Sequence, residues 1–223
     1  MTETLSLRVK IEQSPMGAYQ WMIVVMAAIM NLLDGFDVLA LSFTATAIRG
    51  EFGLTGIELG YLLSAGLFGM TAGSLFLAPL ADKIGRRPLL LMAVSLSAIG
   101  MLGSAFISQY QWLGFWRVIT GLGVGGILVG TNVITSEYSS RKWRSFAISV
   151  YAAGFGIGAV LGGMFAVMLQ GEYGWRSVFL SGAILTGLLL VVLFIWLPES
   201  IDFLTSKQPK NAEVRLNLIA FFI

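Results

Sequence analysis

Long runs of apolar residues, separated by short polar stretches, dominate this chain. Crossing about 30 Å of hydrocarbon takes about 20 helical residues at 1.5 Å each. Short segments of alternating polarity, which would indicate a membrane β-barrel, are missing. The pattern therefore predicts an all-α membrane protein with six transmembrane helices, at Tyr19–Leu41, Ile57–Leu80, Pro88–Ile107, Gln111–Ile134, Ser145–Leu169 and Ser177–Leu197.

Composition agrees with a membrane protein. Of the 223 residues, 57% are hydrophobic and 12% are charged, whereas a soluble domain carries about a quarter of its residues as charge. Histidine and cysteine are absent, which excludes metal and haem sites built on them, disulfides, thiol nucleophiles and Ser-His-Asp triads. We therefore expect no enzyme activity, no cofactor and no metal site.

Lysine and arginine gather on one side of the predicted membrane. With the N-terminus inside, Arg49 and Arg176 lie outside and Arg117 lies within the fourth helix. The positive-inside rule then predicts a multi-pass protein of the cytoplasmic (inner) membrane with both termini cytoplasmic. The basic residues form no nucleic-acid patch, so nucleic acid is not an expected partner. The inner side collects Arg8, Lys10, Lys83, Arg86, Arg87, Arg141, Lys142, Arg144, Lys207, Lys210 and Arg215.

Two short segments echo one another. Gly85-Arg86-Arg87-Pro88-Leu89-Leu90-Leu91 leads into the third helix, and Gly174-Trp175-Arg176-Ser177-Val178-Phe179-Leu180 leads into the sixth. These segments lie on opposite membrane faces, as an inverted-topology repeat requires. The six helices are therefore predicted to form two inverted three-helix repeats.

Three polar residues interrupt the first helix. Asn31, Asp34 and Asp37 are spaced by three and so share an arc of about 120°. An ionised carboxylate at mid-membrane costs about 2.5–3.5 kcal/mol, so these residues should face a bundle interior or a watery cavity. Counting about 1.5 Å per residue places Asp34 and Arg117 at nearly the same membrane depth, which makes Arg117 a candidate counter-charge.

These residues carry the candidate chemistry. Our hypothesis is that Asp34 and Asp37 carry the coupling proton, while Arg117 holds a substrate carboxylate or pairs with an aspartate between cycles. The alternative is a fixed ion pair that only orients the first and fourth helices. Asn31, Phe36 and Tyr151 join Arg117 as candidate substrate-binding residues. Phe36, Phe43, Tyr61 and Tyr151 are candidate walls for an aromatic ring, although aromatic residues often serve only helix packing or lipid contact.

Glycines are frequent in the predicted helices. Gly69 and Gly73, and likewise Gly158 and Gly162, have the spacing that allows helices to approach closely. We expect these four to serve packing; the alternative for Gly158 is a mechanical role, in which it permits the helix to bend during transport.

Several motifs, in order along the chain, resemble the major facilitator superfamily. They are the loop Leu80-Ala81-Asp82-Lys83-Ile84-Gly85-Arg86-Arg87, the pattern Arg117-x-x-x-Gly121-x-Gly123, the pair Glu137 and Arg144, and Pro198-Glu199-Ser200. The loop departs from the family at Ala78, where a glycine is usual. The resemblance implies that Asp82, Arg86 and Arg87, in the gating loop that turns at Gly85, contact the other half of the transporter. We expect Glu137 and Arg144 to contact each other in the next loop and to help gate by pairing differently in two states; the alternative is a solvated pair with no gating role.

Within that superfamily, Asp34-Gly35-Phe36-Asp37 resembles the Asp-Gly-x-Asp element of the aromatic acid/proton symporters. The resemblance implies proton-coupled import of an aromatic or related organic acid. Symport of another organic anion or a sugar, and a non-transporting sensor or inert fragment, are the alternatives. Proton-dependent accumulation would separate transport from sensing.

The resemblance covers only the N-terminal half of the family's twelve-helix architecture. It divides the chain into a cytoplasmic segment at residues 1–18, a six-helix domain at residues 19–197 and a remnant of the central loop at residues 198–223. The final apolar run, Leu218–Ile223, is too short to span a membrane and breaks the loop's amphipathic pattern. We expect a truncated product of a longer gene; the alternative is a homodimer that rebuilds twelve helices. The expected partners are a small organic acid, protons, the lipid bilayer and a second six-helix unit.

Overall fold

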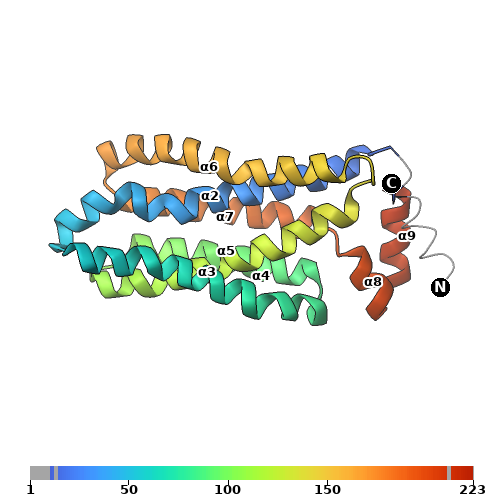
Figure 1. Cartoon of the computed structure of the whole chain (residues 1–223), viewed down its shortest axis with the longest axis horizontal. Coiled ribbons are helices and arrows are strands. Elements are labelled where there is room, and N and C mark those ends of the chain that lie inside the picture. Colours follow the sequence, from blue (N-terminus) through green and yellow to red (C-terminus); the bar gives the residue numbers. More distant parts are fainter. Residues whose placement is uncertain (1–10, 13–14, 210–211, 223) are drawn as a thin grey trace.

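The structure, a computed structural model, describes residues 11–12, 15–209 and 212–222. Among them, six helices are long and apolar enough to cross a membrane, which confirms the predicted number. Two shorter helices follow at the C-terminal end (Figure 1). The helices are α2 (Ala18–Phe52), α3 (Gly56–Ile84), α4 (Arg86–Ala105), α5 (Tyr110–Tyr138), α6 (Arg144–Tyr173), α7 (Arg176–Trp196), α8 (Ile201–Lys207) and α9 (Ala212–Phe222).

The first span is longer than predicted. The apolar pattern weakens after Leu41, but α2 continues to Phe52. Thr44 fits within the helix because its hydroxyl donates a hydrogen bond to the Ala40 carbonyl at 2.8 Å. Gly53, with φ of 63°, then ends the helix in the left-handed conformation that favours glycine. Hydropathy therefore located the span but not its end.

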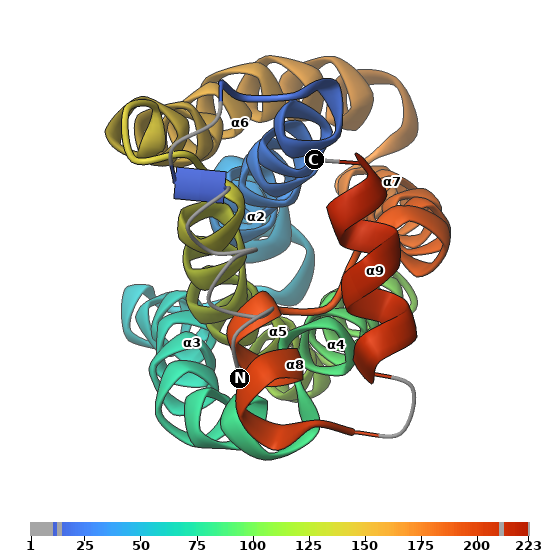
Figure 2. The same cartoon turned by 90° about the vertical axis from the view of Figure 1, so that its right-hand side faces the viewer.

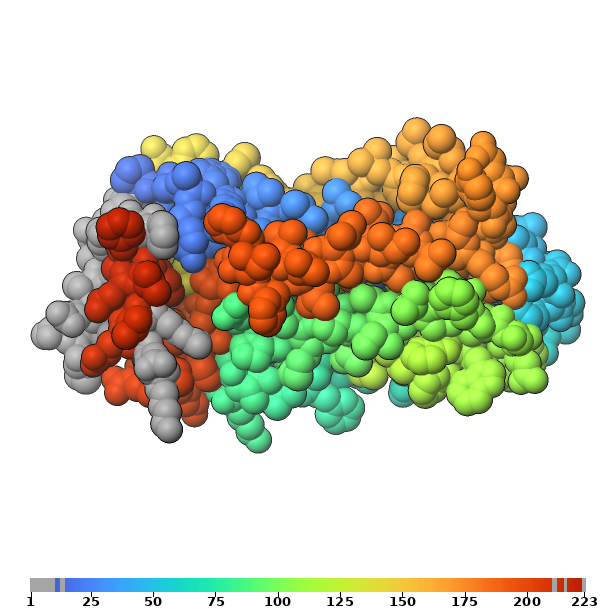
Figure 3. Space-filling model, turned by 180° about the vertical axis from the view of Figure 1, so that it is seen from behind, coloured from blue at the N-terminus to red at the C-terminus, as the bar shows by residue number. Residues whose placement is uncertain are grey.

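The six spans form two triplets that interlock. In the first triplet α2 packs along α6 of the second, and α5 of the second packs along α3 of the first. In an inverted repeat α2 corresponds to α5, and α3 corresponds to α6. The α2–α6 contact is then equivalent to the α5–α3 contact, as the predicted repeat requires. Figure 1 shows α6, α2, α5 and α3 across the front of the bundle, and Figure 3 shows the opposite face, where α4 and α7 lie side by side.

Glycines close both interlocking seams. A side chain at Gly69 or Gly73 of α3 would collide with the backbone of α5, and one at Gly158 of α6 would collide with the backbone of α2. Gly162 instead faces the ring of Phe36. The predicted packing role of these four glycines is confirmed, and backbone contact explains why no larger residue fits at the first three.

The two echoing segments form equivalent turns at opposite ends of the bundle. Gly85, with φ of 103°, precedes α4, and Gly174, with φ of 78°, precedes α7. Both backbone conformations favour glycine. The end that contains Gly85 is called the basic end below, because it carries Lys83, Arg86, Arg87, Arg141, Lys142, Arg144 and Lys207. Three residues of the predicted basic set, Arg8, Lys10 and Lys210, lie outside the described residues.

The segment after α7 is more structured than its polar sequence indicates. Helices α8 and α9 lie at the basic end, with α9 running across it (Figure 2). Ile201, Leu204 and Ile219 are buried and join the hydrophobic cluster that extends down between α2, α4, α5 and α7. The segment therefore packs onto the bundle through apolar side chains. Residues 218–222 of the final apolar run lie in α9, where Phe221 is 84% exposed, and Ile223 lies outside the described residues.

Candidate functional site

The polar residues of α2 point into the bundle. Asn31, Asp34 and Asp37 are 3%, 2% and 1% exposed, as their shared arc predicts. Side chains of this kind are rarely buried in an apolar helix without a partner or a function. Their surroundings therefore decide what the site can do.

Asp37 lies where α2, α4 and α5 meet. The hydroxyl of Ser97 on α4 donates a hydrogen bond to Asp37 Oδ2 at 2.6 Å. Arg117 of α5 reaches the same residue, but its Nη2 donates to the Asp37 backbone carbonyl at 2.7 Å. The predicted proximity of Arg117 to the acidic pair of α2 is confirmed, although the guanidinium bonds the carbonyl oxygen and not the carboxylate.

Arg117 is 3% exposed and has further contacts. Its Nη1 donates to the sulfur of Met101 at 3.4 Å, and its guanidinium carbon lies 5.9 Å from the centre of the Phe179 ring. Its Nε is buried, and within the described residues it has no hydrogen-bond partner. The guanidinium thus retains a free donor.

The two carboxylates also retain free acceptors. Oδ2 of Asp34 and Oδ1 of Asp37 are buried, and the described part of the chain supplies neither atom with a donor. A proton or a mobile cationic donor could satisfy them. The arrangement can therefore bind or release a proton, and can exchange the partner of Arg117, without dismantling the helix bundle.

The predicted substrate-binding residues do not form one cluster. The Asn31 amide donates to the backbone carbonyl of Tyr151 at 2.9 Å, which ties α2 to α6. Phe36 packs against α6, with its ring centre 6.4 Å from that of Phe165. Arg117 of α5 instead bonds Asp37 on α2 and Met101 on α4 and borders a pocket next to α3, so the predicted set does not surround one common space.

The loop between α3 and α4 has the predicted polar contacts and one unpredicted partner. Arg86 forms an ion pair with Asp82 at 2.7 Å, one helical turn apart across Gly85. The Arg87 backbone N–H donates to Glu199 Oε1 at 3.0 Å, and its guanidinium donates to the Phe194 carbonyl at 2.6 Å. The loop is therefore fastened to the segment that follows α7.

Gly85 lies directly against the same glutamate. A Cβ at Gly85 would lie 2.9 Å from the carboxyl carbon of Glu199. The positive φ favours glycine at this turn, and a side chain there would also displace the Glu199 carboxylate.

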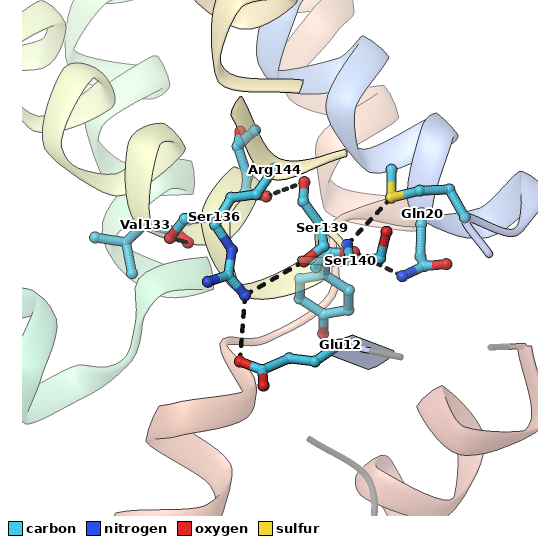
Figure 4. A network of polar contacts seen from close by, with 10 residues as sticks. Glu12, Gln20, Val133, Ser136, Ser139, Ser140 and Arg144 are labelled. Atoms are coloured by element: carbon cyan, nitrogen blue, oxygen red, sulfur yellow. Dashed lines mark hydrogen bonds and ion pairs between the residues drawn. The ribbon is translucent and has the colours of Figure 1, made fainter. Parts of the chain in front are cut away.

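The expected contact between Glu137 and Arg144 is wrong. Glu137 accepts hydrogen bonds from the Ser200 hydroxyl and the Ile201 N–H, both at 2.9 Å, and so caps the start of α8. Arg144 turns to Glu12 at 3.4 Å (Figure 4). Both residues line one cavity of about 130 Å³, but each has its own partner. Those partners lie far away in the sequence, so local spacing could not reveal them.

The opposite end has a fastening that sequence reasoning missed. Glu51, at the end of α2, accepts hydrogen bonds from Trp175 Nε1 at 2.6 Å and from Arg176 Nη1 at 2.9 Å. Arg176 also donates to the Ile107 carbonyl at 3.1 Å. Arg87 and Arg176 occupy equivalent positions in the two similar segments. This similarity could have predicted the contact, because each arginine bonds a carbonyl near the end of the third helix of the other triplet.

Ser97, Met101 and Glu199 were the other site residues that the pattern did not single out for chemistry. Ser97 and Met101 lie on α4, in a stretch that reads as ordinary apolar helix. Within the described residues, no group of three or more acidic side chains gathers as a metal ion would require.

Six membrane-length helices in two inverted triplets, with carboxylates and a guanidinium buried between them, define an integral membrane protein with a polar centre. Residues 27–220 match the Major Facilitator Superfamily, and the chain belongs to that superfamily.

Its relatives include two transporters of Pseudomonas putida. The gallate transporter is 35% identical over 204 residues, which are 92% of this chain and 45% of the relative. The 4-hydroxybenzoate transporter PcaK is 34% identical over 216 residues, which are 97% of this chain and 48% of the relative. The chain therefore spans about half the length of these relatives.

Solved structures agree on the fold. The xylose transporter XylE from E. coli, in a partially occluded inward open conformation, superposes with a TM-score of 0.80 at 23% identity, covering 91% of this chain and 55% of that one. XylE bound to 6-bromo-6-deoxy-D-glucose gives 0.79 at 24% identity, with 92% and 51% covered. The six helices correspond to the N-terminal half of a major facilitator fold.

Proposed function

We propose that this chain is one six-helix half of a secondary transporter that imports an aromatic acid together with protons across the cytoplasmic membrane. The observation that carries the proposal is the under-bonded polar centre, where two buried carboxylates and a buried guanidinium meet between α2 and α5. The gallate and 4-hydroxybenzoate transporters support the substrate class, because both are named for monocyclic aromatic acids.

Asp34 and Asp37 carry the coupling protons in this proposal. Histidine is absent from the chain, so carboxylates are the candidates for proton exchange. Protonating Asp37 would weaken its attraction for Arg117 and so change the balance between two packings of α2 and α5. The single hydroxyl donor to Asp37 supports this role, because few bonds have to break when its charge changes.

Arg117 holds the substrate carboxylate, since a guanidinium fork matches a carboxylate geometrically. Its unpartnered Nε supports that role. Asn31, Phe36 and Tyr151 contribute indirectly in this proposal, by fixing α2 against α6.

The basic end faces the cytoplasm and acts as the gate. Asp82, Gly85, Arg86 and Arg87 form the gating turn, and Glu137 and Arg144 anchor the neighbouring segments. The excess of lysine and arginine there supports this orientation through the positive-inside rule. Residues 1–18 then form a cytoplasmic segment, residues 19–197 the membrane domain and residues 198–223 part of a cytoplasmic central loop.

A second six-helix unit completes the transporter, either from a C-terminal half or from another copy of this chain. In this fold, transport comes from two halves rocking about a central site. Large apolar side chains of α3 and α6, such as Phe68 and Met168, are exposed and form a surface on which such a neighbour can pack.

Uptake by liposomes that contain the chain tests the proposal. If two copies of the chain form the transporter, we expect labelled 4-hydroxybenzoate to accumulate when an inward proton gradient is imposed, and accumulation to stop when an ionophore dissipates the gradient. If a C-terminal half is needed, we expect the same result only with that half supplied. Crosslinking in the same liposomes reports whether the transporting unit is a dimer. A chimera in which this chain replaces the aligned half of PcaK tests the half-transporter form.

The variant Asp34→Asn assigns the proton role. It keeps the side-chain volume but cannot release a proton, so we expect binding without gradient-driven accumulation. Full accumulation by Asp34→Asn would contradict the role of that residue. Binding without accumulation by the unaltered chain and by the chimera would favour a sensor.

A further inference from the structure

A pocket of about 210 Å³ lies beside Arg117. It is bounded by α2, α3 and α5, at the place where α2 and α3 diverge from their shared turn and α5 lies between them (Figure 1). Beyond that turn α2 and α3 contact each other little, whereas both pack on α5. The pocket is therefore a groove, with α2 and α3 as its walls and α5 as its floor.

The walls of this pocket are apolar and its polar groups are few. Arg117 lies at the floor, with Thr120 on the same helix and Ser42 on α2. A pocket with a largely apolar lining and a few convergent polar groups is the usual form of a small-molecule site. The apolar walls are Val38 and Leu39 on α2, Leu63, Leu67 and Met70 on α3, and Val124 on α5.

We propose that this pocket binds a single-ring aromatic carboxylate, with the carboxylate on Arg117 and the ring between α2 and α3, and that Gly66 sets the size of ring it accepts. The proposal rests on the proposed function for its substrate class. It goes further in naming the residues of this chain that bind the ring and a residue that determines specificity.

The charge of the pocket selects its occupant. Arg117 is 3% exposed, and its Nε has no partner among the described residues. A buried cationic donor next to an apolar cavity favours an anion with an apolar body over a neutral lipid chain. The flat, apolar ring of a benzoate-like acid matches both features.

Gly66 controls the space next to the guanidinium. A Cβ at this position would lie 3.6 Å from Arg117 Nη2 and 3.7 Å from Nε, which is ordinary van der Waals contact. An alanine therefore fits without displacing Arg117, whereas a longer side chain would extend into the pocket. Gly60, on the same helix, has open space around it and offers a matched control.

Equilibrium binding of labelled 4-hydroxybenzoate to the purified chain in lipid nanodiscs tests the proposal without requiring transport. We expect Gly66→Leu to raise the Kd by about tenfold or more, since it fills the space that the ring needs. Gly60→Leu should leave the Kd within about twofold, because it adds the same side chain outside the pocket. Thermal unfolding of both variants shows whether each is folded.

Ligand size and charge sharpen the test. Unlabelled benzoate should compete for the wild-type site, and neutral benzamide should not, because it lacks the charge that Arg117 binds. Gly66→Ala should retain benzoate and weaken 2-naphthoate, which has a second ring. If Gly66→Ala weakens both acids equally, Gly66 does not set ring size.

Equal Kd values for Gly66→Leu and Gly60→Leu, or no saturable binding by the wild-type chain, would overturn the pocket. Proton-driven uptake with an unchanged KM in Gly66→Leu would overturn the pocket and leave the proposed transport function intact. Binding that depends on Gly66, with no uptake by the chain or its chimera, would overturn the transport function and leave the pocket intact.

Discussion

Buried or half-buried carboxylates occur in two regions of this molecule, and their hydrogen bonding differs between the two. At the basic end, both oxygens of Glu137 accept hydrogen bonds, and Oε1 of Glu199 accepts two from the backbone N–H groups of Arg87 and Ser200. In the middle of the bundle, Asp37 has one side-chain donor, and one oxygen of each aspartate has no partner within the described residues.

The difference separates structure from function. A carboxylate whose two oxygens are both bonded, as in Glu137, fixes the elements around it and gains nothing from a change of charge. A carboxylate that is buried with a free oxygen costs free energy in the resting state, and such a cost is typical of groups that bind a proton or ligand during a working cycle. Substitutions in the two regions should therefore affect different measurements.

The largest effect is expected at Arg117. Arg117→Ala removes the donor to the Asp37 carbonyl and the proposed anchor of the substrate carboxylate. Losing a buried charged contact of this kind costs about 2–5 kcal/mol, so the Kd for 4-hydroxybenzoate should rise by about 30-fold or more. Arg117→Lys keeps the charge but lacks the planar guanidinium, so its Kd should lie between those of the wild type and Arg117→Ala. Wild-type affinity in Arg117→Ala would show that the middle region does not bind substrate.

A smaller effect, on stability alone, is expected at Glu137. Glu137→Ala leaves the Ser200 hydroxyl and the Ile201 N–H without their acceptor at the start of α8. Unpaired buried groups cost about 1–3 kcal/mol each, so thermal unfolding in detergent should occur at a lower temperature. Glu137→Gln keeps one acceptor oxygen and should lose less. Unchanged stability with lost substrate binding would reverse the distinction between the two regions.

The smallest effect is expected at Asp82. Its side chain is 68% exposed, and exposed ion pairs contribute about 0.2–1 kcal/mol. Asp82→Ala should therefore leave the unfolding temperature nearly unchanged, while under the proposed gating role it slows uptake. A stability loss as large as that of Glu137→Ala would mean that the Asp82–Arg86 pair holds the fold together.

The sequence was sufficient to predict features that depend on local helix geometry. Twenty-residue apolar runs located all six spans, and the spacing of Asn31, Asp34 and Asp37 placed all three inside the bundle. Counting residues along the helices placed Arg117 at the membrane depth of Asp34 on α2, because the rise per helical residue is nearly constant. A glycine at the first position of both similar segments indicated the equivalent turns at Gly85 and Gly174.

Features that depend on tertiary contact were missed. The end of α2 was placed too early, since hydropathy does not register a threonine that bonds its own helix. Glu137 and Arg144 were expected to contact each other, whereas their partners, Ser200 and Glu12, come from segments that are distant in sequence. No spacing rule links Ser97 to Asp37, and only the packing of α4 and of α2 on α5 brings them together.

The most direct test of the central claim compares two modes of transport in liposomes containing Asp37→Asn. This variant keeps an oxygen that can accept from Ser97 but cannot carry a proton. We predict that it exchanges labelled for unlabelled 4-hydroxybenzoate across the membrane like the wild type, yet fails to accumulate it under a proton gradient. Accumulation equal to that of the wild type would contradict the claim that the under-bonded carboxylates of α2 couple protons to transport.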